Sequence, residues 1–243
     1  MNVFFFLQLR TKFIRDFYSE TSFPFIERKR KIEAEEEPFE PPYSEDGEPP
    51  FLQEWMEADE ALDVLGQMCV SMLSSTLQLY LKECINDLHT KYTAEWLQKA
   101  GIGPPEEENK AAFKKGWING NRVYFRDKLR IEWNNAPSNL KPLEEIVLAR
   151  NKVQHPETIT DLHARHWDHD PKNYRRSFFA DEDEIKMIVA APLMDEWFLP
   201  RRLNITKERL WQAIEEVEKF CCWLDGELQK WPSQLETHIA NLG

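Results

Sequence analysis

The chain has 243 residues, of which 42% are apolar, 12% aromatic and 30% charged, with a formal net charge of -12. This is ample apolar material for a folded core, so the composition excludes wholesale disorder. An acidic chain is also a poor match for broad nucleic-acid binding, because phosphate contacts need Lys and Arg.

The compartment predicted from the sequence is the cytoplasm. The apolar run at residues 3–7 is shorter than a signal peptide, and no stretch has the uninterrupted apolar length of a membrane-spanning helix. The four cysteines, Cys69, Cys84, Cys221 and Cys222, lack the C-x-x-C spacing of a metal or redox motif. We therefore expect a soluble protein with buried thiols, no membrane partner and no cofactor.

Residues 1–50 are predicted to form an N-terminal extension to a main domain of residues 51–243. Aromatic and charged side chains alternate as far as Phe25, and we expect the aromatics to pack against the main domain because exposed aromatics are a liability in water. Residues 33–50 are rich in Glu and Pro, which is typical of a linker or surface loop, since Pro breaks helices and like charges repel.

Residues 52–89 carry the strongest helical signal, with no proline, one glycine, and apolar residues recurring every three or four positions. A further helical turn or two over residues 94–100 ends at the sequence GIGPP, a glycine with prolines just beyond it. The basic stretch over residues 110–133 is predicted to be helical, with a bend near Gly116 and Gly120.

The second half of the chain contains two more predicted helices. The first covers residues 141–154, with Pro142 in its first turn, and ends near His155 because the residue before a proline disfavours helical geometry. The other covers residues 206–228, with Thr206 at its start. Between them, residues 156–204 are predicted to be loops with one short hairpin near residues 185–189. The predicted fold is all-α, an antiparallel helical bundle with an irregular insertion over residues 156–204 and an N-terminal extension.

The most informative motif is in the run LEEIVLARNKVQHPE, residues 143–157, where Arg150, Asn151 and His155 follow one another at the end of an amphipathic helix. This Arg-polar-x3-His pattern resembles the motif of the HEPN family (higher eukaryotes and prokaryotes nucleotide-binding). In that family an Arg is followed by a His four to six residues later, late in the third major helix of a bundle of long antiparallel helices. The resemblance covers roughly residues 51–155 and 205–230 and implies a HEPN-like fold.

The resemblance also implies a metal-independent endoribonuclease that acts as a homodimer, with two motifs facing each other across one cleft. His155 would be the acid/base, Arg150 would hold the scissile phosphate, and Asn151 would orient the phosphate or the histidine. The side-chain chemistry suits these roles, because histidine titrates near neutrality and a guanidinium matches phosphate oxygens. HEPN proteins often serve as toxins or defence effectors, so the implied partners are an RNA substrate, a second copy and a protein antitoxin or regulator.

Further basic residues are weaker candidates for RNA contact. They are Lys152 beside the motif and Arg122, Arg126, Lys128 and Arg130 in the basic stretch. Basic residues interleaved with aromatics suit a groove for single-stranded nucleic acid, and they equally suit an amphipathic helix with a cationic face.

Two alternatives stay open at this point. The sequence HARHWDHD contains His163, His166 and His169, whose spacing allows a transition-metal site or simply a polar surface loop. The chain as a whole is also consistent with a non-catalytic helical protein-binding or regulatory module of the same fold, which the net charge favours. A burial of His155 among apolar residues would count against the enzyme hypothesis.

Overall fold

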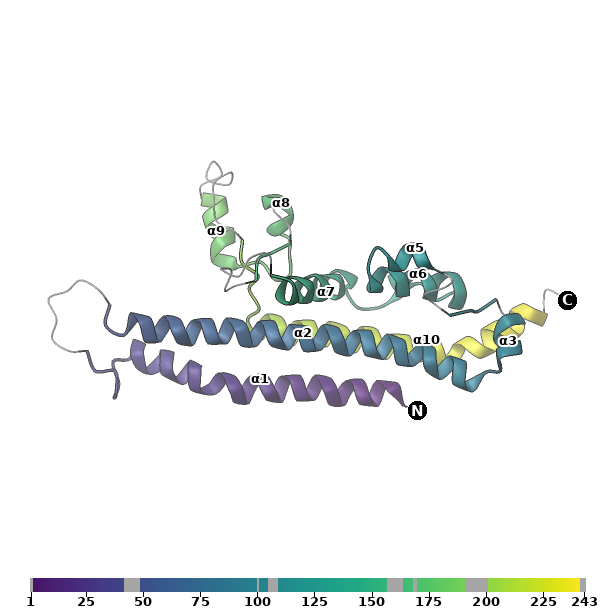
Figure 1. Cartoon of the computed structure of the whole chain (residues 1–243), viewed down its shortest axis with the longest axis horizontal. Helices are drawn as coiled ribbons and strands as arrows, with labels where there is room; N and C mark the ends of the chain where they lie inside the picture. Colours follow the sequence, from purple (N-terminus) through teal and green to yellow (C-terminus); the bar gives the residue numbers. More distant parts are fainter. Residues whose placement is uncertain are drawn as a thin grey trace. The chain divides into compact units, whose positions relative to one another are not determined.

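The computed structural model of the chain (Figure 1) describes residues 2–41, 49–99, 101–104, 109–156, 164–167, 170–190 and 201–240. The elements are α1 (Val3–Glu33), α2 (Leu52–Lys91), α3 (Ala94–Lys99), α5 (Lys110–Phe113), α6 (Trp117–Leu129), the 3-10 helix η1 (Trp133–Asn135), α7 (Leu140–Gln154), α8 (Pro171–Tyr174), α9 (Glu182–Ala190) and α10 (Lys207–Ala240). Within these described ranges, β-structure is limited to two isolated bridges, Arg165 with Arg202 and Ala180 with Leu203. The predicted all-α fold is confirmed.

The chain forms two compact units. Unit 1 comprises Met1–Thr11, Leu73–Val147 and Gln212–Gly243, and unit 2 comprises Lys12–Met72 and Leu148–Trp211. The helices α1, α2, α7 and α10 each contribute residues to both units, so neither unit is a continuous piece of the sequence.

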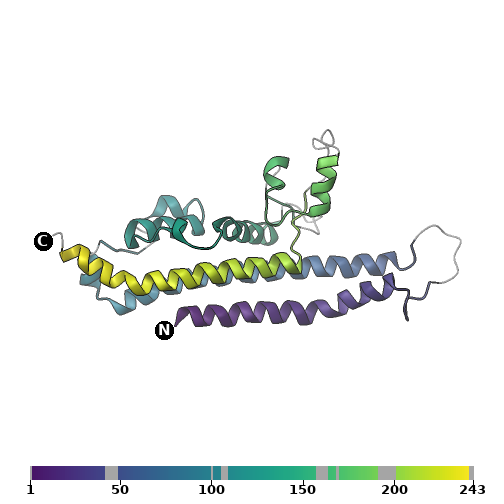
Figure 2. The ribbon, with the colours of Figure 1, turned by 180° about the vertical axis from the view of Figure 1, so that it is seen from behind.

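The core of unit 1 is formed by long helices. The hydroxyl of Tyr80 in α2 donates a hydrogen bond of 2.8 Å to the backbone oxygen of Cys221 in α10, so these helices lie side by side. Figure 2 shows α10 as a continuous ribbon on this side of the molecule. The hydroxyl of Thr11 in α1 donates to the carboxylate of Glu218 at 2.5 Å, which attaches α1 to α10 as well. The buried side chains of this unit include Leu77, Leu81, Val217 and Leu224.

The shorter helices of unit 1 pack on α10 through aromatic rings. Trp133 of η1 meets Phe220 of α10 edge to face, with 4.7 Å between the ring centroids, and Phe125 of α6 lies 5.9 Å from Trp133. The backbone N–H of Asn139 donates to the carboxylate of Glu216 at 2.7 Å. This bond fixes the start of α7 on α10 within unit 1.

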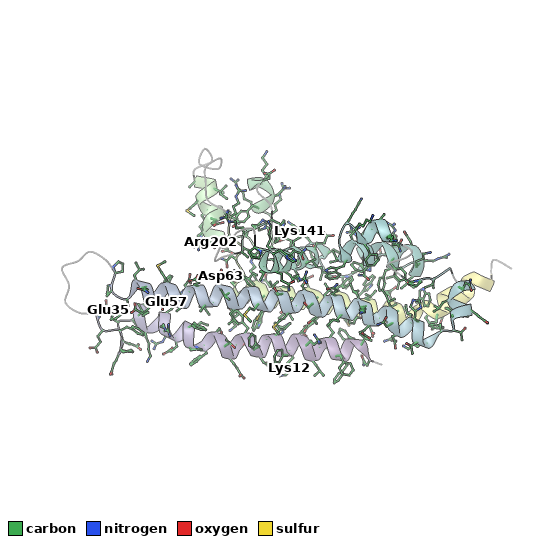
Figure 3. The ribbon with its side chains drawn as sticks, viewed as in Figure 1. Lys12, Glu35, Glu57, Asp63, Lys141 and Arg202 are labelled. Carbon is green, nitrogen blue, oxygen red and sulfur yellow. The ribbon has the colours of Figure 1, made fainter. Side chains whose placement is uncertain are left out.

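Unit 2 joins α1 to α2 and carries the segment between α7 and α10. The ammonium of Lys29 in α1 lies 2.6 Å from the carboxylate of Asp59 and 4.0 Å from the ring of Trp55, both in α2. Tyr18 of α1 meets Trp211 of α10 edge to face at 5.4 Å. At the end of this unit where α1 stops and α2 starts, Figure 3 labels the exposed carboxylates of Glu35 and Glu57.

Most predicted helices are confirmed, although some of their ends differ. The bend in the basic stretch lies at Gly116, which separates α5 from α6 and has φ 120°, a conformation that favours glycine. Thr206 does start α10, because its hydroxyl accepts the backbone N–H of Arg209 at 3.3 Å. The helix ends later than residue 228 and includes Pro232. The ring of buried Trp231, which contacts Tyr92, anchors α10 beyond the predicted end.

The N-terminal extension contains a helix that the sequence analysis did not identify. It is α1, 31 residues long, with Pro24 inside it. The expectation that its aromatics pack inward holds for only part of them, because Tyr18 is buried whereas Phe6 and Phe13 are about half exposed.

The predicted hairpin near residues 185–189 is wrong, because α9 covers these residues. The carboxylate of Asp181 accepts the backbone N–H groups of Asp183 and Glu184 at 2.8 and 2.9 Å. This N-cap, with three acidic residues in the first turn, favours a helix over the β propensity of Ile185 and Val189.

One helix also differs from the expected hydropathy pattern. By length and composition α2 is apolar enough to cross a membrane, although 61% of its most apolar window is buried inside the structure, as in the core helix of a soluble protein. The sequence analysis did not identify this window.

Candidate functional site at the end of helix α7

The motif residues lie on the last turn of α7 and just beyond it, in unit 2. The helix starts at Leu140, where the side chain of Asn139 accepts the N–H of Lys141 at 3.1 Å. Its buried face includes Leu143, Ile146 and Ala149. The backbone N–H of His155 donates to the oxygen of Asn151 at 3.0 Å, so helical geometry extends to His155 although the helix is assigned only to Gln154.

The three motif side chains are accessible to solvent. His155 and Asn151 are exposed and Arg150 is partly exposed. Burial of His155 among apolar residues would have counted against the enzyme hypothesis, and His155 is not buried. Asn151 and His155 are four residues apart and therefore share one face of the helix, one turn above the other.

Arg150 is oriented by its neighbour. Its Nη1 donates to the carboxamide oxygen of Asn151 at 3.0 Å. Among the residues that the structure describes, no carboxylate lies within ion-pair distance of Arg150. The guanidinium thus keeps most of its five donors, which are arranged in a fork that fits phosphate oxygens.

The helix end sets the electrostatic requirement of this site. Carbonyl groups point outward at the C-terminus of α7, and the helix dipole there repels anions. A phosphate bound at this end needs positive side chains, and Arg150 and Lys152 supply two within three residues. Lys152 is three residues from His155 and lies next to it on the helix surface.

The other basic candidates belong to unit 1 and interact with neighbours there. Arg122 forms an ion pair of 2.8 Å with Glu144 of α7 and also donates to Asn119, and Arg126 pairs with Asp127 at 2.6 Å. The ammonium of Lys128 donates to the backbone oxygen of Gly101 at 3.1 Å. These side chains have local structural roles.

Arg130 has a backbone role as well. It ends α6 in a left-handed conformation, with φ 57° and its N–H bonded to the oxygen of Arg126. The basic stretch therefore contributes to the packing and capping of α6 and α7 in unit 1.

The histidine-rich segment does not assemble a metal site within the described residues. His163 and His169 lie outside the residues that the structure describes. His166 is buried, with Nε2 2.7 Å from the hydroxyl of Ser177 and its ring stacked on Trp167 at 4.0 Å. In the described part of the chain, no group of three or more His, Cys, Asp or Glu side chains could hold a metal ion.

His166 instead belongs to a polar network that the sequence analysis missed. Its ring meets Tyr174 edge to face at 4.9 Å, and the Tyr174 hydroxyl donates to Glu184 and accepts the N–H of Asp181. Burial and the adjacent Glu184 carboxylate raise the pKa of the Tyr174 hydroxyl. Glu184 in turn accepts the backbone N–H of Arg202, labelled in Figure 3.

This network is structural. It ties α8 and α9 to residues 201–204, and these residues are far apart in the sequence. The spacing of residues gave no signal for it, because its members meet only after the segment has folded.

Comparisons of the chain with models of known protein families, with curated proteins and with solved structures found no match. The functional hypothesis therefore rests on the chemistry and geometry of the motif in α7.

Proposed function

We propose that the protein is a metal-independent endoribonuclease of the HEPN type that acts through Arg150, Asn151 and His155. The observation that carries the proposal is the arrangement at the end of α7. A guanidinium without a carboxylate partner among the described residues is hydrogen-bonded to Asn151, and an exposed imidazole lies one turn beyond that amide.

The reaction would be an attack of a ribose 2′-hydroxyl on the adjacent phosphorus. His155 would take the proton of the 2′-hydroxyl while the new oxygen–phosphorus bond forms. The bond to the 5′-oxygen breaks, and this leaving oxygen needs a proton from an acid. The products would be a cyclic phosphate and a free 5′-hydroxyl, so no metal or cofactor enters the balance.

The phosphate carries extra negative charge as the reaction proceeds, and Arg150 would stabilise it through paired hydrogen bonds. Asn151 would hold the guanidinium in place through the bond that already exists between the two side chains. Each chain contributes one motif histidine, so a second copy would supply the acid for the leaving oxygen. A homodimer is thus part of the proposal.

The test is cleavage of several unstructured RNAs by the purified protein in the presence of EDTA. We expect His155→Ala to lower the cleavage rate by about 100-fold or more, which is the usual contribution of a general acid or base. Arg150→Ala is expected to have a comparable effect. The matched control is His89→Ala, because His89 is also exposed but lies at the end of α2.

Asn151→Asp separates an orienting role from a merely structural one. A carboxylate can still accept the hydrogen bond of Arg150, but it places a negative charge beside the phosphate, so binding of RNA should weaken while the stability of the fold stays unchanged. Cleavage that is equal in the wild type and in His155→Ala would refute the proposal. Absence of cleavage by the wild type would favour the alternative, a non-catalytic helical module that binds a protein partner.

A further inference from the structure

Unit 1 contains a cavity of about 470 Å³ between the end of α2 and the second half of α10. Residues 84–92 line one side, residues 225–232 line the other, and Val3 of α1 completes part of the wall. Figure 2 shows this part of α10 beside the end of α2. Binding sites for small molecules usually measure about 300–1,000 Å³, so the cavity has the size of a ligand site.

Two aspartates line the cavity, Asp87 from α2 and Asp225 from α10. Asp87 has a cationic partner, because the ammonium of Lys91 lies 2.6 Å from its carboxylate. Asp225 accepts a hydrogen bond of 2.7 Å from the amide of Gln229, and among the described residues no cation lies within ion-pair distance of it. A neutral amide satisfies the hydrogen bonding of a carboxylate but leaves its charge uncompensated.

The negative charge acts on the buried end of the cavity, where Cys84 is only 4% exposed. Burial is the main cause that raises the pKa of the Cys84 thiol to about 12, against a hydrogen bond with Tyr80 that lowers it. The carboxylates of Asp225, Asp87 and Glu83 raise this pKa as well. Since low-dielectric walls strengthen the field of such charges, the cavity favours a positively charged ligand.

The remaining wall is apolar and aromatic, with Leu88, Leu228 and Tyr92 among its residues. The ring of Tyr92 is stacked on Trp96 with 4.5 Å between the centroids, and it meets Trp231 edge to face at 6.0 Å. These contacts hold the ring in position. An aromatic ring attracts an organic cation through its electron-rich face, and the leucines accommodate hydrocarbon.

We propose that this cavity binds a small organic cation, an amine whose ammonium group contacts Asp225 and whose hydrocarbon part lies against Leu228 and Tyr92. A charge-assisted hydrogen bond from the ammonium group would replace the weaker bond from the neutral amide of Gln229. The cavity lies in unit 1 and the motif at the end of α7 lies in unit 2, so this proposal is independent of the proposed nuclease activity.

Two other classes of ligand fit the cavity less well. In the part of the chain that the structure describes, no group of three or more His, Cys, Asp or Glu side chains could hold a metal ion. An anion would find Lys91 as the single cationic side chain among the described lining residues, and Lys91 is already paired with Asp87. An organic cation uses both the charge and the volume of the cavity.

The experiment is isothermal titration calorimetry of the full chain with 2-phenylethylamine and with 2-phenylethanol, a neutral analogue of nearly the same shape. We expect one site for the amine and an affinity lower by about tenfold or more for the alcohol, because hydrogen bonds between charged groups are the stronger ones. Asp225→Asn should remove this difference, since the asparagine still accepts the bond from Gln229 but carries no charge.

The matched control is Asp127→Asn, which removes the same charge from an exposed position of α6 outside the cavity. The affinity for the amine should not change in this variant. Tyr92→Leu tests the aromatic wall and should weaken the binding of both compounds. Urea denaturation checks the fold of each variant, and the comparison of amine with alcohol on the wild type depends on no variant.

Three results would overturn the proposal. The first is a wild type that shows no saturable binding of the amine at millimolar concentrations. The second is equal affinity for the amine and the alcohol, which would mean that the carboxylates take no part. The third is a loss of affinity in Asp127→Asn as large as that in Asp225→Asn, which would indicate diffuse attraction to an acidic chain.

Discussion

The sharpest test of the fold is the substitution of Gly66 by alanine. Gly66 lies inside α2, where a glycine normally costs about 1 kcal/mol relative to alanine. If helix propensity alone decided the outcome, Gly66→Ala would therefore stabilise the protein. In the structure, a Cβ at this position would lie 2.4 Å from the backbone oxygen of Ile205 and 3.2 Å from its Cβ.

The steric effect should exceed the gain in helix propensity. The obstructing atom is a backbone carbonyl oxygen, which cannot turn away as the end of a side chain can. Inserting a carbon into a packed interior costs about 1–3 kcal/mol, and a backbone obstacle places this site at the upper end of that range. After the propensity gain of about 1 kcal/mol, we expect Gly66→Ala to lower the free energy of unfolding by about 2 kcal/mol.

Gly226 provides the matched control, because it lies inside α10 and a Cβ there meets no atom within 4 Å. Gly226→Ala should raise the free energy of unfolding by about 0.5–1 kcal/mol. Both variants can be compared with the wild type by urea denaturation followed by circular dichroism. If Gly66→Ala is as stable as Gly226→Ala, the close approach of residue 205 to α2 is incorrect, and so is the packing of the α7–α10 segment in unit 2.

Two further predictions concern titratable groups. Burial, with smaller contributions from Cys69 and Glu208, raises the pKa of Tyr18 from 10.0 to about 12. Because the folded state disfavours the ionised phenol, the raised pKa of Tyr18 contributes fully to the stability of the fold below pH 10. This contribution is lost as the pH rises towards 12. Urea denaturation across this window should show a loss on the order of 2–3 kcal/mol that Tyr18→Phe reduces. Among the thiols, burial raises the pKa of Cys221, whereas Cys222 is exposed. Iodoacetamide should therefore label only Cys222 of this pair in the native protein, which peptide mass spectrometry can verify. Equal labelling of both cysteines would contradict the packing of α10.

The helices that could be predicted from the sequence are those with one apolar face and clear ends. The helix α7 is an example, with a capping Asn139 before it and Pro156 after it. The helix α1 could not be predicted in the same way, because Phe6 and Phe13 add a second apolar face opposite Leu7 and Ile14. A helix that is apolar on two sides has no single stripe for periodicity to detect.

In the α9 region, the sequence analysis predicted strands where the structure has a helix. Its run of Ile185, Ile188 and Val189 has high β propensity, and that suggested a hairpin. The deciding interactions are the N-cap of Asp181 and the bond from the amide of Asn204 to the same carboxylate. The cap could be found in the sequence, whereas the bond to Asn204 spans 23 residues and exists only in the folded segment.

The two candidate histidines that the structure describes, His155 and His166, differ in the same way: one has local contacts and the other has contacts with residues distant in the sequence. The contacts of His155 are local, because its backbone N–H bonds to the oxygen of Asn151 four residues earlier, and the Asn151 side chain accepts a hydrogen bond from Arg150. His166 is defined by Ser177 and Tyr174, which approach it through the folding of α8, and this burial makes it part of the structure. The side chain of His155 is exposed to solvent. The imidazole of His166 is buried and its Nε2 is already bonded to the hydroxyl of Ser177, so the search for activity should begin at the end of α7.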